Sequence, residues 1–288
     1  MKLPNILERE EVREQIRRAL EEDLGPEGID VTSVALVPES ERAEAHLVAR
    51  ERCRLSGVDV AAAVFREVDP ALECEATARD GTDVAAGEVV LKVSGSARSI
   101  LTAERTALNF IQRMCGIATV TARYVAAAGN PRVQILDTRK TTPTLRTFEK
   151  YAVLCGGGTN HRYGLFDAVL IKDNHLAAWA RHHGGVGEAV RAARERFPDL
   201  KIEVEVDTEE QLREALEARP DWVLLDNMSP ERLRRCVELC RGVCRTEASG
   251  GITLETIAEV AATGVDAVSV GALTHSARAV DLALDFVS

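Results

Sequence analysis

The sequence predicts an α/β protein in two parts, an N-terminal α+β module and a (β/α) barrel. Over roughly the first 100 residues, short strands of alternating character are separated by glycines. From about residue 130 onward, apolar strands that end in polar residues are each followed by a helical stretch, an order that indicates a parallel sheet. Because no Gly-x-Gly-x-x-Gly follows any of these strands, a barrel is favoured over an open dinucleotide-binding sheet.

The N-terminal module begins with an amphipathic helix, whose apolar face carries Val12, Ile16, Ala19 and Leu20. Apolar and polar residues then alternate in three short segments. Strands are expected there, at 45–49, 72–78 and 89–93. A long helix follows, over 100–127.

The long helix carries a polar stripe of Arg105, Asn109, Gln112 and Gly116. A solvated face is the ordinary explanation of such a stripe. Exposed faces usually carry Glu and Lys, however, whereas this one combines amides with a guanidinium and ends in glycine. We therefore expect it to pack against another subunit or a ligand.

The barrel part contains six apolar segments that predict strands, several of them apolar enough to be buried on both faces. They are 133–137, 168–172, 202–207, 222–226, 245–249 and 267–271. Chemistry in a barrel lies at the carboxyl ends of its strands. Charged residues, a serine and glycines follow or end these apolar segments: Arg139, Lys140, Lys172, Glu205, Asp226, 249–251 and Gly271.

Basic side chains are concentrated in one part of a chain that is acidic as a whole. The formal net charge is −10, which argues against a nucleic-acid partner. Cations at element ends therefore predict a binding site for a small substrate with several negative charges. The cations in question are Arg139, Lys140, His161, Arg162 and Lys172.

Each strand-end residue also has a purely structural explanation. Lys172 could extend its charge into solvent, and Asp226 could be only a helix-capping turn residue. Glu203, Glu205 and Asp207 point to one side of their strand, and carboxylates inside a barrel need partners or a cation. Glu205 lies nearer the mouth and is the better candidate for a functional role.

Glycines after the last two strands predict a phosphate site. Bare backbone N–H groups and a helix N-terminus at this position of a barrel form a cradle for a 5′-phosphate. The alternative is a pair of ordinary tight turns. The candidates are Ser249, Gly250, Gly251, Gly271, Ala272 and His275.

Composition and termini indicate a cytoplasmic protein without a membrane anchor. The 288 residues contain no apolar stretch approaching the ~18 residues of a membrane span, and the first ten contain no signal-type apolar region. Seven cysteines without paired spacing suit a reducing compartment. Cys236, Cys240 and Cys244 follow helical spacing; such a stripe does not surround one ion, so no metal is assigned to them.

Several linked motifs, which together span nearly the whole chain, resemble the quinolinate phosphoribosyltransferase family. They are Leu101-Thr102-Ala103-Glu104-Arg105-Thr106-Ala107-Leu108-Asn109-Phe110, Asp137-Thr138-Arg139-Lys140-Thr141-Thr142-Pro143, Gly157-Gly158-x-x-His161-Arg162-x-Gly164-Leu165-x-Asp167, Leu170-Ile171-Lys172-Asp173-Asn174-His175, Glu203-Val204-Glu205-Val206 and Ala248-Ser249-Gly250-Gly251-Ile252. One departure is Cys115, where the family often has serine. It leaves the predicted activity intact.

The resemblance implies an N-terminal α/β sandwich (hammerhead-like) domain and an incomplete (β/α) barrel of the type II phosphoribosyltransferase kind. We expect the first domain over 1–105, with 276–288 packed on it, and the barrel over 106–275. The resemblance also implies a homodimer in which Arg105 reaches the active site of the partner, with assembly beyond the dimer left open.

The implied reaction joins quinolinate and phosphoribosyl pyrophosphate to give nicotinate mononucleotide, pyrophosphate and CO2, with Mg²⁺, in NAD biosynthesis. Arginine forks suit carboxylates and lysines suit phosphates, which accounts for the basic residues. Quinolinate would be bound by Arg105, Thr138, Arg139, His161, Arg162 and Lys172. Lys140 with Lys172 would neutralise pyrophosphate, and Glu205 and Asp226 would bind the ribose hydroxyls or Mg²⁺.

Three alternatives remain open at the level of sequence. A Schiff-base aldolase would also use a strand-end lysine such as Lys172, but it does not need the surrounding arginines. A same-fold enzyme could instead use nicotinate, or belong to the homologues linked to molybdate transport. Residues 81–91 have the look of a lipoyl-type carrier hairpin, but no lysine lies in its turn, so we interpret them as structural.

Overall fold

The computed structural model describes residues 3–287, and their contacts divide them into two compact units. The first unit comprises the chain up to Ala122, the segment Thr141–Gly157 and the chain from Leu273 onward. The second comprises Arg123–Lys140 and Gly158–Ala272. The domain limits expected from the sequence, 1–105 and 106–275, stay a prediction.

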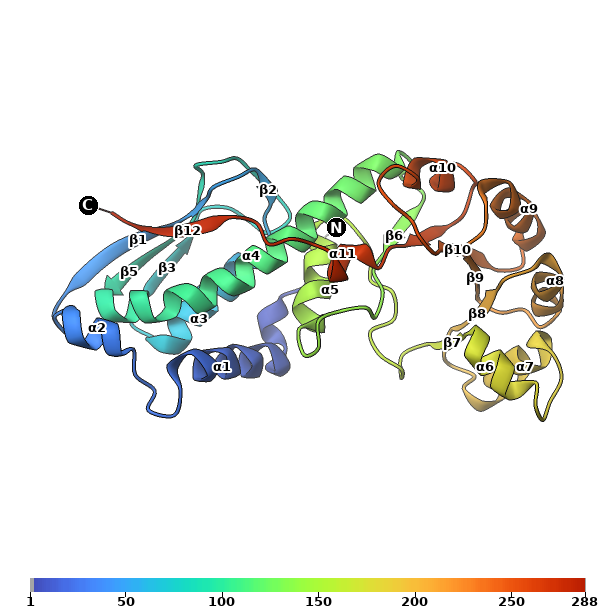
Figure 1. The fold of residues 1–288 in the computed structure, drawn as a ribbon, viewed down its shortest axis with the longest axis horizontal. Helices are drawn as coiled ribbons and strands as arrows, with labels where there is room; N and C mark the ends of the chain where they lie inside the picture. The colour runs from blue at the N-terminus through green and yellow to red at the C-terminus, as the bar shows by residue number, and fades with distance from the viewer. Residues whose placement is uncertain (1–2, 288) are drawn as a thin grey trace. The chain divides into compact units, whose positions relative to one another are not determined.

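The first unit combines an antiparallel sheet with helices (Figure 1). Its sheet has the strand order β12-β1-β5-β3. The elements that lie wholly in this unit are η1 (Ile6–Glu8), α1 (Glu10–Leu24), α2 (Val31–Leu36), β1 (Arg42–Ala49), β2 (Cys53–Arg54), α3 (Val58–Val68), β3 (Glu73–Ala76), β4 (Asp83–Val84), β5 (Val89–Ser96), α5 (Arg146–Cys155) and β12 (Leu282–Phe286).

The N-terminal elements expected from the sequence are confirmed. Helix α1 buries Val12, Ile16 and Leu20 of the predicted apolar face, and Ala19 of that face is half-buried. Strands β1, β3 and β5 overlap the three alternating segments with different ends, and α3 packs on β3 and β5. The C-terminal strand β12 pairs with β1, which places the end of the described chain in this sheet.

Helix α4 (Ala97–Ala128) is the long helix predicted from the sequence, but half of its polar stripe faces its own chain. The amide of Gln112 donates to the carbonyl of Leu282 at 2.7 Å. A Cβ atom on Gly116 would lie 1.9 Å from the carbonyl oxygen of Arg278. These two residues therefore pack on the returning C-terminal segment, which corrects the expectation of a subunit or ligand contact for them.

Gly116→Ala is expected to destabilise the first unit. The added methyl group would meet backbone, which cannot move aside as a side chain can, so we expect a loss of about 1–3 kcal/mol in the free energy of unfolding. Urea denaturation would measure it. Val125→Ala, at an exposed position of the same helix, is the control and should change stability by at most about 0.5 kcal/mol.

The second unit is built on a six-stranded parallel sheet with the order β6-β11-β10-β9-β8-β7. Its elements are β6 (Gln134–Leu136), β7 (Val169–Ile171), α6 (Asp173–Trp179), α7 (Val186–Arg196), β8 (Ile202–Val206), α8 (Glu209–Glu217), β9 (Trp222–Asp226), α9 (Pro230–Cys240), β10 (Arg245–Ser249), α10 (Ile257–Ala261) and β11 (Ala267–Ser269). A short helix, α11 (Ala272–His275), follows at the boundary of the two units.

The six predicted barrel strands are confirmed, and the sheet is an incomplete barrel. Strands β6 and β7 are its two edges and do not pair with each other in the described chain. Thr159 pairs with Leu136 in an isolated parallel bridge, so the segment after Gly158 runs beside β6. Helices α8 and α9 lie on the outer side of the strands (Figure 1).

The cysteine stripe expected on one helix face is only partly correct. Helix α9 ends at Cys240, so Cys236 and Cys240 lie on it and are buried, while Cys244 lies beyond its end and is half-buried. All seven cysteines are free thiols.

Candidate active site

The carboxyl ends of the parallel strands bring together four residues predicted to be catalytic. Lys140 follows β6, Lys172 follows β7, Glu205 lies near the end of β8 and Asp226 ends β9. Parallel strands end at one edge of the sheet, so residues distant in sequence meet there. The two lysines are exposed and the two carboxylates are half-buried.

The pKa values of the two carboxylates report how closely these charges interact. Burial raises the pKa of Glu205, the charge of Asp226 raises it further, and Lys172 opposes the rise. Burial also raises the pKa of Asp226. The amide of Asn227 and then the charges of Lys140 and Lys172 act against that rise. The carboxylates and lysines therefore form one electrostatic group.

Asn227 orients Asp226. Its amide nitrogen donates to the Asp226 carboxylate at 2.5 Å, and its backbone N–H donates to the carbonyl of Ser249 at 2.9 Å. Gly250 has a φ of +93°, and a Cβ there would lie 2.2 Å from Asn227 Oδ1. Only glycine fits this close approach, which connects the end of β10 to the end of β9.

The phosphate-binding candidates of the second unit lie in the loops after β10 and β11. Gly251 also has a positive φ of +62°. Helix α11 begins directly after Gly271, whereas α10 begins only at Ile257. A helix N-terminus therefore follows Gly271 directly, whereas loop backbone follows the glycine pair after β10.

Arg139 and Arg162 are neighbours in the same unit. Burial and then the positive charge of Arg139 lower the pKa of Arg162, whose guanidinium donates to the carbonyl of Ala168 at 3.2 Å. Arg139 is half-buried, and its Nε has no hydrogen-bond partner. Two adjacent guanidinium groups repel each other, and a dianion between them would relieve the repulsion.

Asp137 holds the segment that carries His161 and Arg162. Its carboxylate is fully buried at the end of β6. It accepts hydrogen bonds from the backbone N–H of His161 at 2.9 Å and from the side chain of Asn160 at 2.6 Å. The hydroxyl of Thr138, the next residue, accepts from the backbone N–H of Lys140 at 3.0 Å.

His161 lies between two buried carboxylates. Its Nε2 is 2.9 Å from Glu203 Oε2 and 3.3 Å from Glu247 Oε2. Burial alone would favour the neutral ring, but the hydrogen bonds to both carboxylates outweigh it and raise the pKa of His161 to about 10. Burial and the charge of Glu247 raise the pKa of Glu203. The ring is therefore an imidazolium at neutral pH.

A cavity of about 510 Å³ reaches this cluster at the opposite end of the sheet from Lys140 and Lys172. It is lined by residues at the amino ends of the strands together with the His161 cluster. These include Gln134, Trp222 and Arg245, the first residues of β6, β9 and β10. His161 thus lies deeper in the sheet than the strand-end group.

The charge of His161 predicts a specific loss of stability at alkaline pH. A group with a raised pKa contributes stability that is present below its unfolded pKa of about 6.5 and is lost as the pH rises through about 10. We expect the free energy of unfolding to fall between pH 7.5 and 10. His161→Gln should flatten this fall in urea denaturation at each pH, and an equally steep fall in that variant would contradict the prediction.

Two predicted site residues lie in the first unit. Arg105 is exposed on α4, and His275 is exposed at the end of α11, where its Nδ1 lies 2.7 Å from the Ser276 hydroxyl. Asn109 is also exposed, one helical turn after Arg105.

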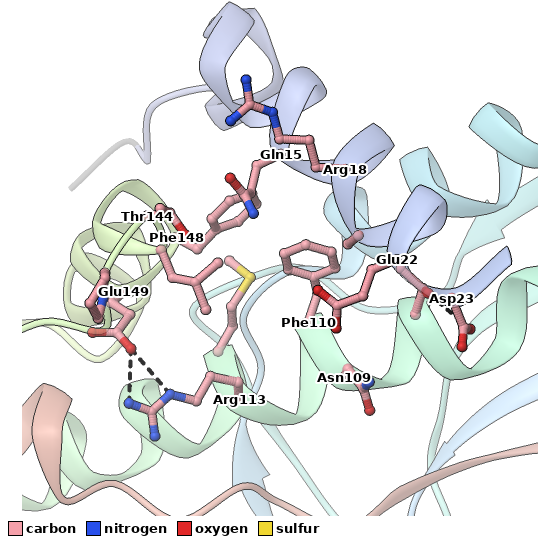
Figure 2. A pocket seen from close by; sticks show the side chains of 15 residues that line it. Gln15, Arg18, Glu22, Asp23, Asn109, Phe110, Arg113, Thr144, Phe148 and Glu149 are labelled. Carbon is pink, nitrogen blue, oxygen red and sulfur yellow. Dashed lines mark hydrogen bonds and ion pairs between the residues drawn. The ribbon is translucent and has the colours of Figure 1, made fainter. Parts of the chain in front are cut away.

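A second cavity, of about 400 Å³, lies in the first unit between α1, α4 and residues 143–149. Figure 2 shows its wall, with Phe110 and Phe148 at a centroid distance of 4.9 Å. The guanidinium of Arg113 is held by the buried carboxylate of Glu149, at 2.8 Å, and by the carbonyl of Ala277. The other arginine in the lining, Arg18, donates to Glu14 at 3.0 Å. Because both cations are already engaged, the anionic substrate is not assigned to this cavity.

Two family models match the chain in succession. "Quinolinate phosphoribosyl transferase, N-terminal domain" matches residues 30–115, and "Quinolinate phosphoribosyl transferase, C-terminal domain" matches residues 117–285. The chain belongs to the quinolinate phosphoribosyl transferase family. The resemblance inferred from the sequence motifs is thereby confirmed, and so is the prediction of an enzyme.

Relatives of the quinolinate phosphoribosyl transferase family match nearly the whole chain. The carboxylating nicotinate-nucleotide pyrophosphorylase of Mycobacterium leprae is 46% identical over 278 residues, 95% of this chain and 96% of that one. The chloroplastic enzyme of Arabidopsis thaliana is 44% identical, over 93% and 81% of the two chains. The solved nicotinate-nucleotide pyrophosphorylase of Francisella tularensis superposes with a TM-score of 0.91 at 40% identity, covering 99% and 98%.

Sequence reasoning missed three residues that support the site of this quinolinate phosphoribosyl transferase. Glu247 lies in β10, two residues before the predicted phosphate residue Ser249. Nothing in the sequence around Glu247 indicated a contact with His161. Asn227 directly follows the predicted strand end at Asp226, and Asn160 directly precedes His161, but their contacts with Asp226 and Asp137 depend on the fold. A polar residue inside an otherwise apolar strand is the one signal that could have singled out Glu247.

Proposed function

We propose that this chain transfers the phosphoribosyl group of phosphoribosyl pyrophosphate to quinolinate, with decarboxylation, in de novo NAD biosynthesis. The products are nicotinate mononucleotide, pyrophosphate and CO2. Membership of the family supports the proposal. The observation that carries it is the grouping of Lys140, Lys172, Glu205 and Asp226 at the carboxyl ends of the strands, where each lysine acts on the pKa of a carboxylate.

Quinolinate is a dicarboxylate and needs several fixed cations. Arg139 and Arg162 offer adjacent guanidinium groups, and His161 adds an imidazolium. Thr138 and Lys172 complete the set proposed in this chain. Arginine forks bind carboxylates in two-pronged geometry, so the site would hold the ring in one orientation.

The reaction needs no protein nucleophile. The pyridine nitrogen attacks the anomeric carbon as the bond to pyrophosphate breaks, and the bonding pair leaves with pyrophosphate. Lys140, with Lys172, would stabilise the negative charge on that leaving group. Glu205 and Asp226 would favour the positive charge that develops on the ribose. The N-ribosylated pyridinium then loses CO2: the electron pair of the broken C–C bond stays on the ring carbon beside the positive nitrogen, and that carbon takes up a proton from water.

Glu205 and Asp226 also fit a divalent cation. They are two half-buried carboxylates whose mutual repulsion raises the pKa of Glu205, and oxygen ligands of this kind suit Mg²⁺. Bound together with phosphoribosyl pyrophosphate, Mg²⁺ would supply charge neutralisation of the pyrophosphate oxygens. Ser249, Gly250, Gly251, Gly271, Ala272 and His275 are proposed for the 5′-phosphate.

We further propose a homodimer in which Arg105 enters the active site of the partner subunit. Its exposure on α4 and the amide beside it, Asn109, support a contact surface.

A cytoplasmic location is proposed as well, because all seven cysteines are free. Among residues 3–287, the helices are too short or too polar to cross a membrane.

The test is an assay with quinolinate, phosphoribosyl pyrophosphate and Mg²⁺ that measures nicotinate mononucleotide and CO2 together. We expect the two products in equal amounts. Nicotinate serves as a parallel substrate. Turnover of nicotinate alone would replace the proposal by the sister activity, and turnover of neither would favour the molybdate-linked homologues.

A further inference from the structure

His161 is held by two carboxylates that the proposed reaction does not use. Glu203 Oε2 lies 2.9 Å and Glu247 Oε2 3.3 Å from the same ring nitrogen. The two glutamates are only 6% and 2% exposed, so bulk water weakens these contacts little. Two buried carboxylates near a site for a dianion would repel the substrate unless a cation separated them from it.

The three residues come from separate parts of the second unit, which makes the contact a product of the fold. Glu203 lies on β8 and Glu247 on β10, and β9 lies between these strands. Asp137, at the end of β6, accepts a hydrogen bond from the backbone N–H of His161 and so fixes the backbone that carries the ring. The ring is thus fixed from both sides, by its backbone and by its Nε2.

We propose that Glu203 and Glu247 are positioning residues for quinolinate, which hold His161 as an oriented imidazolium and supply the site with a third fixed cation beside Arg139 and Arg162. This inference rests on the proposed function. Neither carboxylate touches substrate in it; both act through the ring. Their contribution is expected in binding of the dicarboxylate and not in departure of pyrophosphate.

A divalent cation on the same three side chains is the alternative. Their ligand atoms all lie within 4.8 Å of one another, and Glu203 Oε1 is buried without a hydrogen-bond partner. A metal would need the neutral imidazole, however, because Nε2 cannot carry a proton and a metal at once. The cavity lining does not decide between the two, because Asp167 and Asp199 line it together with Arg162 and Arg245. The single nitrogen Nε2 faces both carboxylates, and a protonated Nε2 can donate to them, so the imidazolium is favoured.

The kinetic test uses Glu203→Gln and Glu247→Gln, which keep the side-chain shape and remove the charge. We expect the KM for quinolinate to rise about ten- to a hundredfold, the loss that one charge-assisted hydrogen bond carries, with kcat and the KM for phosphoribosyl pyrophosphate within about twofold. Glu238→Gln, at an exposed position of α9, is the control and should leave all three constants unchanged. An unchanged KM for quinolinate in both variants would overturn the proposal.

A second measurement does not depend on enzymatic activity. Nitrogen-15 NMR of the wild-type histidines, with the His161 signals assigned through His161→Gln, should show both ring nitrogens protonated at pH 8. A neutral ring at that pH would overturn the positioning role of Glu203 and Glu247. So would Zn²⁺ binding to the wild type, seen by calorimetry, that Glu203→Gln abolishes.

The two proposals can fail separately. A wild-type protein that makes no nicotinate mononucleotide from quinolinate refutes the proposed function, whatever the NMR spectrum shows. An active wild type with a neutral His161, or with Gln variants that bind quinolinate normally, refutes only the positioning role.

Discussion

Lys140→Ala should lower kcat about 10²- to 10³-fold while changing the KM for quinolinate by no more than about twofold. Lys140 follows β6 at the carboxyl edge of the sheet, and its charge acts on the pKa of Asp226. A cation placed there stabilises charge that grows on pyrophosphate as its bond to the ribose breaks. The negative charge on pyrophosphate is larger in the transition state than in the bound substrate. Loss of the Lys140 cation should therefore lower kcat more than it weakens binding. Steady-state kinetics with both substrates varied would measure the split.

Lys201→Ala is the matched control for this prediction. Lys201 is an exposed lysine that directly precedes β8, so it lies at the amino ends of the strands, where it lines the cavity that reaches His161 and is away from the group around Lys140. Its replacement should leave kcat unchanged. Equal losses in kcat and in the affinity for quinolinate after Lys140→Ala would assign Lys140 to substrate binding and would remove it from the leaving-group role.

Two inactive variants, Arg105→Ala and Lys172→Ala, should regain activity when their subunits are mixed. If Arg105 serves the partner's site, a hybrid dimer contains one site with both residues intact and one with neither. With free exchange in equal amounts, about a quarter of wild-type activity should return. Co-expression with two affinity tags, followed by the standard assay, would measure it.

The same experiment with Arg139→Ala in place of Arg105→Ala provides the control. Arg139 and Lys172 both lie in the second unit of one chain, so every site of a hybrid dimer keeps one defect. No activity should return from that pair. Failure of the Arg105 pair to regain activity, with hybrids shown to form, would place Arg105 in the site of its own chain or outside any site.

Much of the architecture could be predicted from the sequence because it depends on local pattern. The predicted strands 222–226 and 245–249 match β9 and β10 at both ends, since apolar runs bounded by turn residues mark buried strands. The strand-end position of Lys172 and Asp226 followed as well. Parallel strands present their carboxyl ends at one edge, so order along the chain is enough to group them.

Other predictions failed or were incomplete where a residue's partner lies far away in sequence. Gln112 and Gly116 looked like part of an interface stripe, but the C-terminal segment returns to cover them. Helical periodicity gives the face on which a residue lies and not the segment that covers that face. The phosphate site was predicted from glycines and a helix N-terminus after the last two strands; a helix follows Gly271 directly, whereas α10 begins only at Ile257.

By itself the sequence determined the two-part α/β organisation, the family and the gathering of basic residues around the predicted strand ends. Only the tertiary structure decided that His161 meets both Glu203 and Glu247 and that Asn227 holds Asp226. The physical reason is that a sequence pattern reports on neighbours along the chain and not on neighbours in space. Alternation along a strand fixes which side chains point inward, whereas the contacts among them depend on the register between strands and on the path of the loops.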